Sequence, residues 1–550
     1  MPKNRETAKG QANPKLSYEP AVDYFTEQGL AGARSYFGNV ERGQNKVFTT
    51  PFAKGETTRH MLDEWLNHLE PLKKEWPSLW NFENDLAAKV GPMSVQKPLS
   101  ERISDVESYY TDVLPSGESV HPRALQAAYA ELKPIHGLRL RSTGATVDNM
   151  KLSTNSGTPW WIKRRLVTQE ATSSQVGVWP RLGEVLPILT HGRDLWRMAA
   201  VLGWRGQEGG PNPDDVKQRV VWMFPFAVNI VEARCYQPLI EAVQKCNIYA
   251  PWVSNDAVDE RVTELFRSKD SSDPIVCTDF TKFDQHFGEP LQTAANQLLS
   301  AVFTKYNEFE QWLRVIYPMK YNMPMIIGLE GDKVKVFKGH HGMGSGSGGT
   351  NADETLAHRC LQFEAAIRSN KRLNPSSMCL GDDGILSYPG INVEAVIEAY
   401  SSHGLEMNES KQYVSSQDCV FLRRWHHENY VIDGKCVGVY STCRALGRMR
   451  YLERFMDPEV WSKEAVALRQ LSILENIKYH PLKEEFVQFC MKRDKYRLGL
   501  DIPDFLDGLV DQARKVIDHM PDFLGYTKTL QGETVDGINN WWIVKYLKSL

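Results

Sequence analysis

The sequence predicts an α+β protein with an antiparallel sheet and a helical region toward the C-terminus, and three observations support this fold class. Residues 378–387 place Gly-Asp-Asp-Gly between two apolar runs, the pattern of a β-hairpin. Residues 275–280 form another strand-like run, which carries Asp279 near its end. From about residue 440 onward, the spacing of Leu, Arg and Glu indicates helices.

Composition limits the classes of protein to which the chain can belong. With 550 residues and 42% hydrophobic content, it can build a large core and more than one domain. A net charge of −3 excludes attraction to nucleic acid by the whole-molecule field, so RNA binding would need local basic surface. Nine cysteines without a C-x-x-C pair predict reduced, mostly buried thiols. No signal peptide or membrane-length apolar run is evident, so we expect a soluble intracellular protein without a membrane partner.

Acidic residues at two distant points are the candidate chemical centre. Asp279 ends a strand-like run, and Asp382 and Asp383 occupy the hairpin turn. Carboxylates in such positions are good ligands for hard cations such as Mg²⁺ or Mn²⁺, although Asp and Gly are also common in any tight turn. If the two points converge, they can hold two divalent ions for in-line phosphoryl displacement. We therefore predict Asp279, Asp382 and Asp383 as catalytic metal ligands.

Residues 342–350 form a glycine-rich stretch between these acidic points, followed by a helical pattern over residues 351–370. Glycines let backbone N–H groups approach an anion, and the following helix N-terminus favours negative charge. A flexible linker is the alternative interpretation. The position between the two acidic stretches favours a phosphate-binding role.

Basic residues gather in residues 151–219, in contrast to the whole chain. Ser156 and Gly157 lie in a Gly/Pro turn that is followed by two Trp and the run 163–165 (Lys163, Arg164 and Arg165), a combination typical of single-stranded nucleic-acid channels. A surface turn beside a buried Trp is the alternative. Lys217 and Arg219 alternate along an extended segment, so both face one side and can meet a triphosphate.

The order and wording of these stretches resemble motifs A, B and C of viral RNA-dependent RNA polymerases. Residues 279–284 are similar to motif A, residues 345–350 to motif B, and residues 381–383 to motif C. The sequence segments that contain these motifs, DFTKFDQHF, GSGGTNADETLAHR and LGDDG, are most similar to those of picobirnavirus polymerases, and next to those of partitivirus-like polymerases. The motifs run in the order A, B, C, unlike the permuted order of birnaviruses.

The resemblance implies roles for the motif residues. Asp279 and Asp382 would bridge two metal ions, Mg²⁺ with Mn²⁺ as an alternative, and Asp383 would be a secondary ligand. Asp284 would recognise the ribose 2′-OH. At the motif B position where the wider family has Asn, this chain has Glu, which puts the details of sugar recognition in doubt. The motif B residues expected to bind substrate are Ser345, Gly346, Thr350, Asn351 and Glu354.

Four further motifs are individually weaker. Residues 154–165 resemble motif G at template entry, and Lys217 with Arg219 resembles the basic motif F. Lys411 resembles the motif D lysine, which would donate a proton to pyrophosphate, although an exposed lysine is the simpler interpretation. Arg423 and Arg424 resemble motif E and would hold primer phosphates, with an ordinary edge hairpin as the alternative.

The implied fold is a closed right hand of palm, fingers and thumb, with an antiparallel palm sheet and a helical thumb. The expected regions are a tail and extension (1–60), mainly fingers with finger-thumb linking elements (61–270), palm motif A (271–287), palm helix and finger insertion (288–340), palm motifs B to E (341–435), and thumb with C-terminal tail (436–550). Residues 1–20 are expected to be a mobile tail. One hypothesis places the terminal Trp541 and Trp542 in the product channel, although paired Trp more often anchor a tail in the core.

The implied activity is template-directed transfer of NTPs to an RNA 3′-OH, which replicates and transcribes a double-stranded RNA genome. RNA template, RNA product and NTPs are the expected partners, with viral capsid protein as a further candidate. The virion interior and host cytoplasm are the expected locations. Two alternatives remain at this point: a reverse transcriptase, and a non-catalytic RNA-binding virion protein in which the acidic turn is structural.

Overall fold

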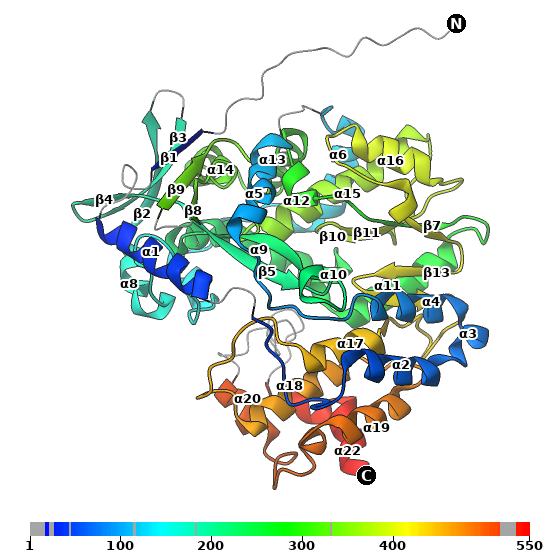
Figure 1. The fold of residues 1–550 in the computed structure, drawn as a ribbon. Coiled ribbons are helices and arrows are strands. Elements are labelled where there is room, and N and C mark those ends of the chain that lie inside the picture. Colours follow the sequence, from blue (N-terminus) through cyan, green and yellow to red (C-terminus); the bar gives the residue numbers. More distant parts are fainter. Residues whose placement is uncertain are drawn as a thin grey trace, which may run out of the picture.

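The computed structural model describes residues 17–20, 27–42, 46–113, 117–181, 184–329, 333–516 and 535–550. In Figure 1 a region of sheets and helices occupies the upper part of the molecule and a helical region the lower part. The upper part holds most of the segments expected as fingers and palm, and the lower part holds those expected as thumb together with helices from residues 58–87. We use these three names below.

The palm centres on a sheet of four strands in the order β10-β11-β7-β12, and all of its pairs are antiparallel, as expected. All four residues of β7 are buried, as a central strand covered on both faces requires. Helices pack against this sheet and against one another. The palm elements are β7 (Ile275–Thr278), β10 (Met378–Leu380), β11 (Asp383–Leu386), β12 (Tyr413–Ser415), α6 (Pro122–Leu132), α12 (Phe283–His286), α13 (Glu289–Val302), α15 (Thr350–Arg368) and α16 (Val393–Ser401).

The fingers contain a five-stranded sheet in the order β1-β9-β8-β5-β6 and a separate sheet β2-β3-β4. Residues 17–20, expected in a mobile tail, instead form β1 and pair with β9, because their extended backbone completes the sheet edge; residues 1–16 lie outside the described residues. The strands are β1 (Ser17–Pro20), β2 (Gln175–Arg181), β3 (Glu184–His191), β4 (Asp194–Arg197), β5 (Ala200–Gln207), β6 (Lys217–Met223), β8 (Met325–Leu329) and β9 (Lys333–Lys338).

The helices of the fingers and of their border with the palm bury their apolar residues partly in one large core shared with the palm helices and partly in three smaller clusters. The 20-residue α9 follows β6 directly and carries Pro238 within it. These helices are α1 (Glu27–Arg42), α5 (Ile103–Thr111), α7 (Thr143–Asp148), α8 (Thr168–Ser173), α9 (Phe226–Lys245), α10 (Ala250–Val253), α11 (Asn255–Ser268) and α14 (Asn307–Met319).

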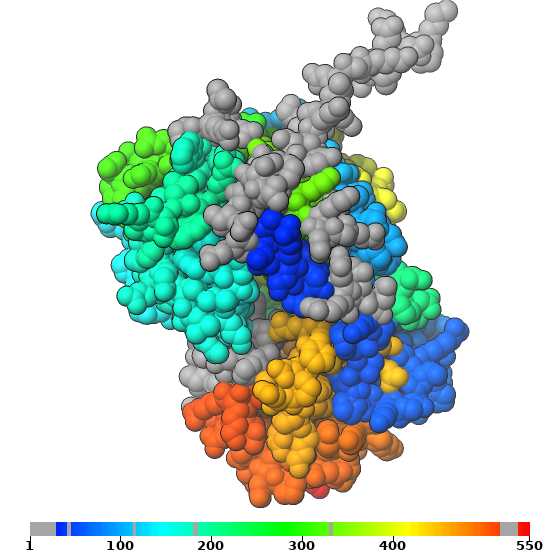
Figure 2. Space-filling model, turned by 60° about the vertical axis from the view of Figure 1, so that its left-hand side comes forward, coloured from blue at the N-terminus to red at the C-terminus, as the bar shows by residue number. Residues whose placement is uncertain are grey.

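The thumb is helical, as expected, and has its own apolar core. Three helices from the N-terminal part of the chain, within residues 58–87, join this core. Figure 2 shows them in blue against the orange thumb. The helices of this region are α2 (Thr58–Leu69), α3 (Leu72–Glu75), α4 (Pro77–Ala87), α17 (Thr442–Arg450), α18 (Lys463–Glu475), α19 (Lys483–Arg493), α20 (Leu509–Val516) and α22 (Trp542–Ser549). A three-stranded sheet in the order β13-β14-β15 lies between palm and thumb, because β13 packs on the palm sheet and Trp425 of β14 packs in the thumb core. Its strands are β13 (Asp418–Phe421), β14 (Arg424–His427) and β15 (Val439–Tyr440).

A buried carboxylate attaches α4 to the thumb. Glu83 is fully buried and accepts hydrogen bonds from Thr442 N at 2.8 Å, Cys443 N at 3.1 Å and His480 Nε2 at 3.0 Å. Burial alone would raise the pKa of Glu83, but the bonds from His480 and the helix N–H groups outweigh it and hold that pKa below its ordinary value. The side chain thus caps the N-terminus of α17 from another part of the chain.

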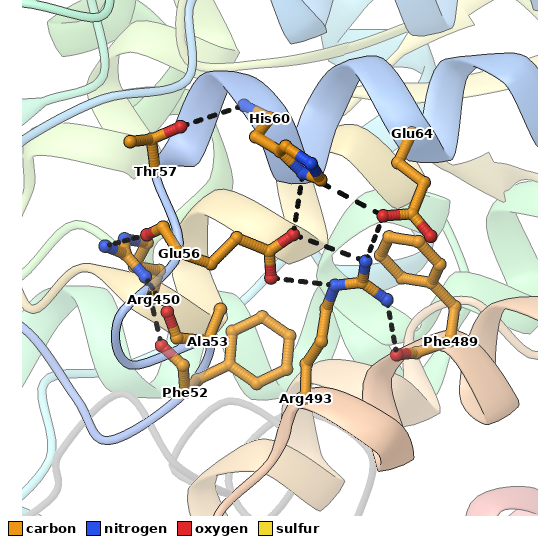
Figure 3. A network of polar contacts seen from close by, with 9 residues as sticks. All are labelled: Phe52, Ala53, Glu56, Thr57, His60, Glu64, Arg450, Phe489 and Arg493. Carbon is orange, nitrogen blue, oxygen red and sulfur yellow. Dashed lines mark hydrogen bonds and ion pairs between the residues drawn. The ribbon is translucent and has the colours of Figure 1, made fainter.

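Residues 46–97 connect the thumb with the fingers. Near the thumb, Arg450 donates to Ala53 O at 2.6 Å and Arg493 to Glu56 Oε2 at 3.0 Å (Figure 3). At the other end, Lys97 N donates to the Gln218 side chain on β6 at 3.1 Å. One continuous segment therefore closes the hand from thumb to fingers.

The C-terminal helix packs on the outside of the thumb. Trp542 N and Ile543 N donate to the Glu475 carboxylate at 3.2 and 3.0 Å, and the Trp542 ring stacks on Tyr546. The paired Trp therefore anchor the described end of the tail on the thumb, as the alternative interpretation expects. The reason is that α22 buries its apolar face in the thumb core.

All nine cysteines lie in described parts of the chain and none forms a disulfide. Eight are buried, and Cys246, just beyond α9, is exposed. Among the described helices, none has the length and apolar character that a membrane span would need.

Candidate active site

The strand register brings the two acidic points together. Thr278, the last residue of β7, pairs with Gly384 of β11, so Asp279 continues toward the turn that carries Asp382 and Asp383. Burial raises the pKa of Asp279, the nearby Asp382 raises it further, and Lys411 opposes both. Three carboxylates from distant parts of the sequence thus converge at one edge of the palm sheet.

The hairpin turn is held from behind by α15. Gly381 has a φ of +57°, a conformation that favours glycine, and its N–H donates to Thr355 Oγ1 at 3.0 Å. His358 Nδ1 donates to Gly381 O at 2.8 Å, and burial lowers the pKa of His358 to about 4, so the ring is neutral. A Cβ on Gly384 would lie 2.7 Å from the same ring. Neither Thr355 nor His358 could be identified from sequence, because their role depends on how α15 packs against the turn.

The two turn carboxylates differ in surroundings. Asp383 Oδ2 accepts a hydrogen bond from Leu422 N at 2.8 Å, whereas Asp382 is exposed. Burial, followed by repulsion from Asp382, raises the pKa of Asp383 to about 7. Asp383 therefore also supports the β13–β14 turn, while Asp279 and Asp382 face the open side.

A glutamine that sequence reasoning missed positions Asp279. Gln412 Oε1 accepts from Asp279 N at 2.8 Å, and Gln412 Nε2 donates to Asp279 O at the same distance. The pair of bonds mimics one strand pair at the end of β7. Lys411, its neighbour, is exposed beside Asp279 and attracts its carboxylate.

Cations face the carboxylates from three elements. Lys217 and Arg219 are both exposed on β6, on one side of the strand, as the alternation predicts. Burial lowers the pKa of Lys217, and nearby Lys89, Lys411 and Arg219 lower it further. Lys89 follows α4, outside every motif, and the sequence offered no signal for its approach to the site.

The motif B loop lies against β6. Ser345 Oγ accepts from Trp222 N at 3.3 Å, and a Cβ on Gly346 would collide with the Trp222 carbonyl. Thr350 Oγ1 donates to Gly344 O and to Ser347 O, each at 3.0 Å. These hydroxyls therefore shape the loop itself.

Glu354, and not Asn351, is the partner of Asp284. Asn351 Oδ1 accepts from Trp252 Nε1 at 2.7 Å, whereas the buried Glu354 is hydrogen-bonded to Asp284. Burial, followed by the adjacent Asp284, raises the pKa of Glu354 well above its ordinary value. Tyr109 of α5, which the sequence analysis did not single out, lies near both carboxyl groups. Burial, followed by the charges of Asp284 and Glu354, raises the pKa of Tyr109 well above its ordinary value.

Comparison with known proteins places this geometry in a family. A family model described as viral RNA-dependent RNA polymerase matches residues 214–436. A human picobirnavirus protein (strain Human/Thailand/Hy005102/-) named "Potential RNA-dependent RNA polymerase" is 53% identical over 524 residues, covering 94% of this chain and 96% of that protein. The chain belongs to the picobirnavirus RNA-dependent RNA polymerases.

Two solved structures of the RNA-dependent RNA polymerase of a human picobirnavirus resemble this polymerase over 98% of its length and 100% of theirs. One has a TM-score of 0.89 at 51% identity. The other, an insertion-loop deletion mutant, has a TM-score of 0.88 at 50% identity. The expected closed right-hand fold is confirmed, as is RNA-directed RNA polymerase activity in a double-stranded RNA virus, and neither alternative function is favoured.

Two residues of the polymerase's motif G that were expected to bind RNA, Ser156 and Gly157, are buried, and their backbone N–H groups donate within the turn. Ser156 is fully buried and its Oγ accepts from Ile162 N at 3.3 Å; Gly157 is buried with a φ of +64°. Both shape the turn instead. Arg164 turns inward and donates to Asn229 Oδ1 at 2.9 Å, while Lys163 and Arg165 are exposed.

Of the two motif E arginines, only Arg423 remains in a position to meet RNA. Arg424 is 8% exposed, pairs with Asp259 at 3.1 Å and donates to Gly438 O at 3.0 Å. Its expected contact with primer phosphates is therefore wrong, because Arg424 begins β14, whose first three residues are all buried, and its guanidinium is taken up by Asp259 and Gly438. Leu422 and Arg423 form the turn with φ of 52° and 60°, which leaves Arg423 exposed.

The donor set at the palm edge fits a divalent metal, which polymerases of this family use. Oxygen ligands from three carboxylates suit a hard cation. Glu56, His60 and Glu64 form another close group, with ligand atoms within 4.8 Å. Figure 3 shows Arg493 pairing with both of its carboxylates, so the protein already supplies a cation there.

Proposed function

We propose that Asp279 and Asp382 are the principal metal-binding and catalytic residues of this polymerase, with Asp383 as a secondary ligand. The observation that carries the proposal is the pairing of Thr278 with Gly384, which supports convergence of the three carboxylates. A pair of bound divalent ions would activate the RNA 3′-OH and stabilise the pyrophosphate. Mg²⁺ is the proposed ion, with Mn²⁺ as an alternative, because hard oxygen ligands suit both.

The chain's own cations would neutralise the nucleotide. Lys217 and Arg219 extend from one side of β6 toward the carboxylates, a placement that suits the triphosphate. Lys411 beside Asp279 is the proposed proton donor to the leaving pyrophosphate. Lys89 adds a further positive charge at the same edge.

Ribose would be recognised by the hydrogen-bonded pair Asp284 and Glu354. A carboxyl pair with one proton can both donate to and accept from the 2′-OH, which a lone carboxylate cannot. Ser345, Gly346, Thr350 and Asn351 would then act mainly by shaping the loop and helix that carry Glu354.

The decisive assay is incorporation of labelled NTPs on a single-stranded RNA template with Mg²⁺, comparing the wild type with Asp382→Asn. We expect incorporation to fall to background in the variant, because one ligand charge is lost. Asp63→Asn, an exposed change on α2, is the matched control and should keep full activity. Full activity in Asp382→Asn would contradict the proposed metal role.

Sugar recognition is tested by replacing Glu354 with Gln and measuring kcat/KM for an NTP and its 2′-deoxy analogue. We expect the preference for NTP to fall roughly 10-fold, since a recognised hydroxyl is worth about 1 to 1.5 kcal/mol. An unchanged ratio would remove Glu354 from sugar recognition.

We also propose that the polymerase works in the virion interior and host cytoplasm, with capsid protein as a partner. The support is its relatedness to a polymerase of a double-stranded RNA virus. Sedimentation of particles from infected cells tests this: polymerase should co-sediment with capsid after a high-salt wash. Recovery only in the soluble fraction would contradict the proposal.

A further inference from the structure

The start of α9 lies beneath the motif B loop and carries two buried polar side chains. Asn229 is 6% exposed and Glu232 is fully buried one helical turn later. Buried polar groups are costly unless they are hydrogen-bonded, so their partners show what they hold in place.

Asn229 connects two segments that are far apart in sequence. Its Oδ1 accepts from Arg164 Nη2 at 2.9 Å, and its Nδ2 donates to Gly346 O at 3.1 Å and to Glu232 Oε1 at 3.3 Å. One amide therefore bonds the template-entry segment on one side and the motif B loop on the other.

Glu232 extends the connection along the loop. Its Oε2 accepts from Ser347 Oγ, and its carboxylate also accepts from the backbone N–H at residue 348. Ser347 Oγ in turn accepts from the N–H at residue 349. The loop is thus fastened to α9 at successive residues before α15 begins.

The Arg164 side chain points toward α9. Its guanidinium lies over the Phe226 ring, 4.9 Å from the ring centroid, and donates to Asn229. The flanking Lys163 and Arg165 are exposed. The basic run therefore divides into two residues that face outward and one that faces α9.

We infer that Asn229 and Arg164 are positioning residues that couple the template-entry segment to the motif B loop. The segment that binds template and the loop that binds nucleotide are then held together by the hydrogen bonds of Asn229. This inference rests on the proposed roles of those two segments in binding template and substrate. Lys163 and Arg165 supply charge to the template, whereas Arg164 sets the loop through Asn229.

The test compares Asn229→Ala, Asn229→Asp and Arg164→Lys in the full-length polymerase. Each alters a bond of the connection. Arg164→Lys replaces the Nη2 donor to Asn229 with an ammonium of shorter reach, and Asn229→Asp keeps the acceptor for Arg164 but loses the donor to Gly346 O. We expect KM for NTP to rise about 5-fold to 10-fold in all three, with kcat within about 2-fold. Combining Arg164→Lys with Asn229→Ala should add little, because both break the same connection.

Arg165→Ala is the matched control. It should weaken template binding and reduce the slope of log affinity against log salt by about 1, with NTP KM unchanged. Arg164→Lys should leave that slope unchanged. A wild-type salt slope in Arg165→Ala would mean that the proposed RNA contact of this segment has failed, independently of the coupling.

Three results would overturn the inference: additive effects of the two substitutions on KM, a wild-type KM in Asn229→Asp, or a reduced salt slope in Arg164→Lys. Thermal midpoints separate positioning from misfolding. A variant whose unfolding midpoint stays near that of the wild type while its KM rises supports positioning.

Discussion

Glu232→Gln should change how the polymerase's stability depends on pH. Burial raises the pKa of Glu232 from 4.5 to about 7, against the opposing effects of Lys320 and of the hydrogen bonds from Ser347, residue 348 and Asn229. A raised carboxyl pKa means that the folded state holds its proton more tightly than the unfolded state. Stability from this group is therefore complete below pH 4.5 and is lost as pH rises through about 7.

Between pH 5 and pH 8 the wild type should lose about 2 to 3 kcal/mol of stability through Glu232, since each pKa unit corresponds to roughly 1.4 kcal/mol. Glutamine does not titrate, so the variant lacks this loss. For a chain of this length, with an unfolding entropy of roughly 1 kcal/mol/K, the difference corresponds to about 2 °C.

The assay is differential scanning fluorimetry of both proteins at pH 5 and pH 8. The midpoint of the wild type minus that of the variant should fall by about 2 °C between the two pH values. Because both proteins share every other titrating group, the double difference isolates residue 232. An equal pH dependence in the two proteins would refute the assignment of a raised pKa to Glu232.

Two further predictions follow from the site. Arg424→Ala should destabilise the fold by about 3 to 5 kcal/mol, because Asp259 is left buried without its arginine partner. Arg423→Ala should leave the melting temperature unchanged and weaken RNA binding in a salt-dependent way. Calorimetry and filter binding of both variants would show a reversed pattern if Arg423, and not Arg424, were the buried partner of Asp259. Gly346→Ala should abolish incorporation in the labelled-NTP assay while the thermal midpoint is nearly retained. The added Cβ would collide with the Trp222 carbonyl and displace the motif B loop. Wild-type activity in this variant would show that the loop tolerates the displacement.

Sequence alone could predict the parts of the site that are set by local chemistry. A Gly-Asp-Asp-Gly turn between apolar runs can form little except a hairpin, and a strand that ends on Asp279 needs only pairing to meet it. The alternation of Lys217 and Arg219 on β6 likewise follows from the period of a strand. Each of these features depends on a few adjacent residues.

The remaining features depend on packing between distant elements. Arg164 and Arg424 each lie in a basic run, and nothing local distinguishes the arginine that bonds a buried partner from the one beside it. Lys89 and Gln412 reach Asp279 from outside every motif. The N-terminal strand β1 also escaped prediction, because its partner β9 lies some three hundred residues away.

The distribution of thiols gives this polymerase a ready attachment point. Eight cysteines are shielded inside the protein, and Cys246 alone is exposed. A maleimide dye should therefore couple at a single position in the unmodified enzyme, at the far end of the helix whose first turn holds Asn229. Fluorescence from that dye would report on the fingers during elongation without any engineered cysteine.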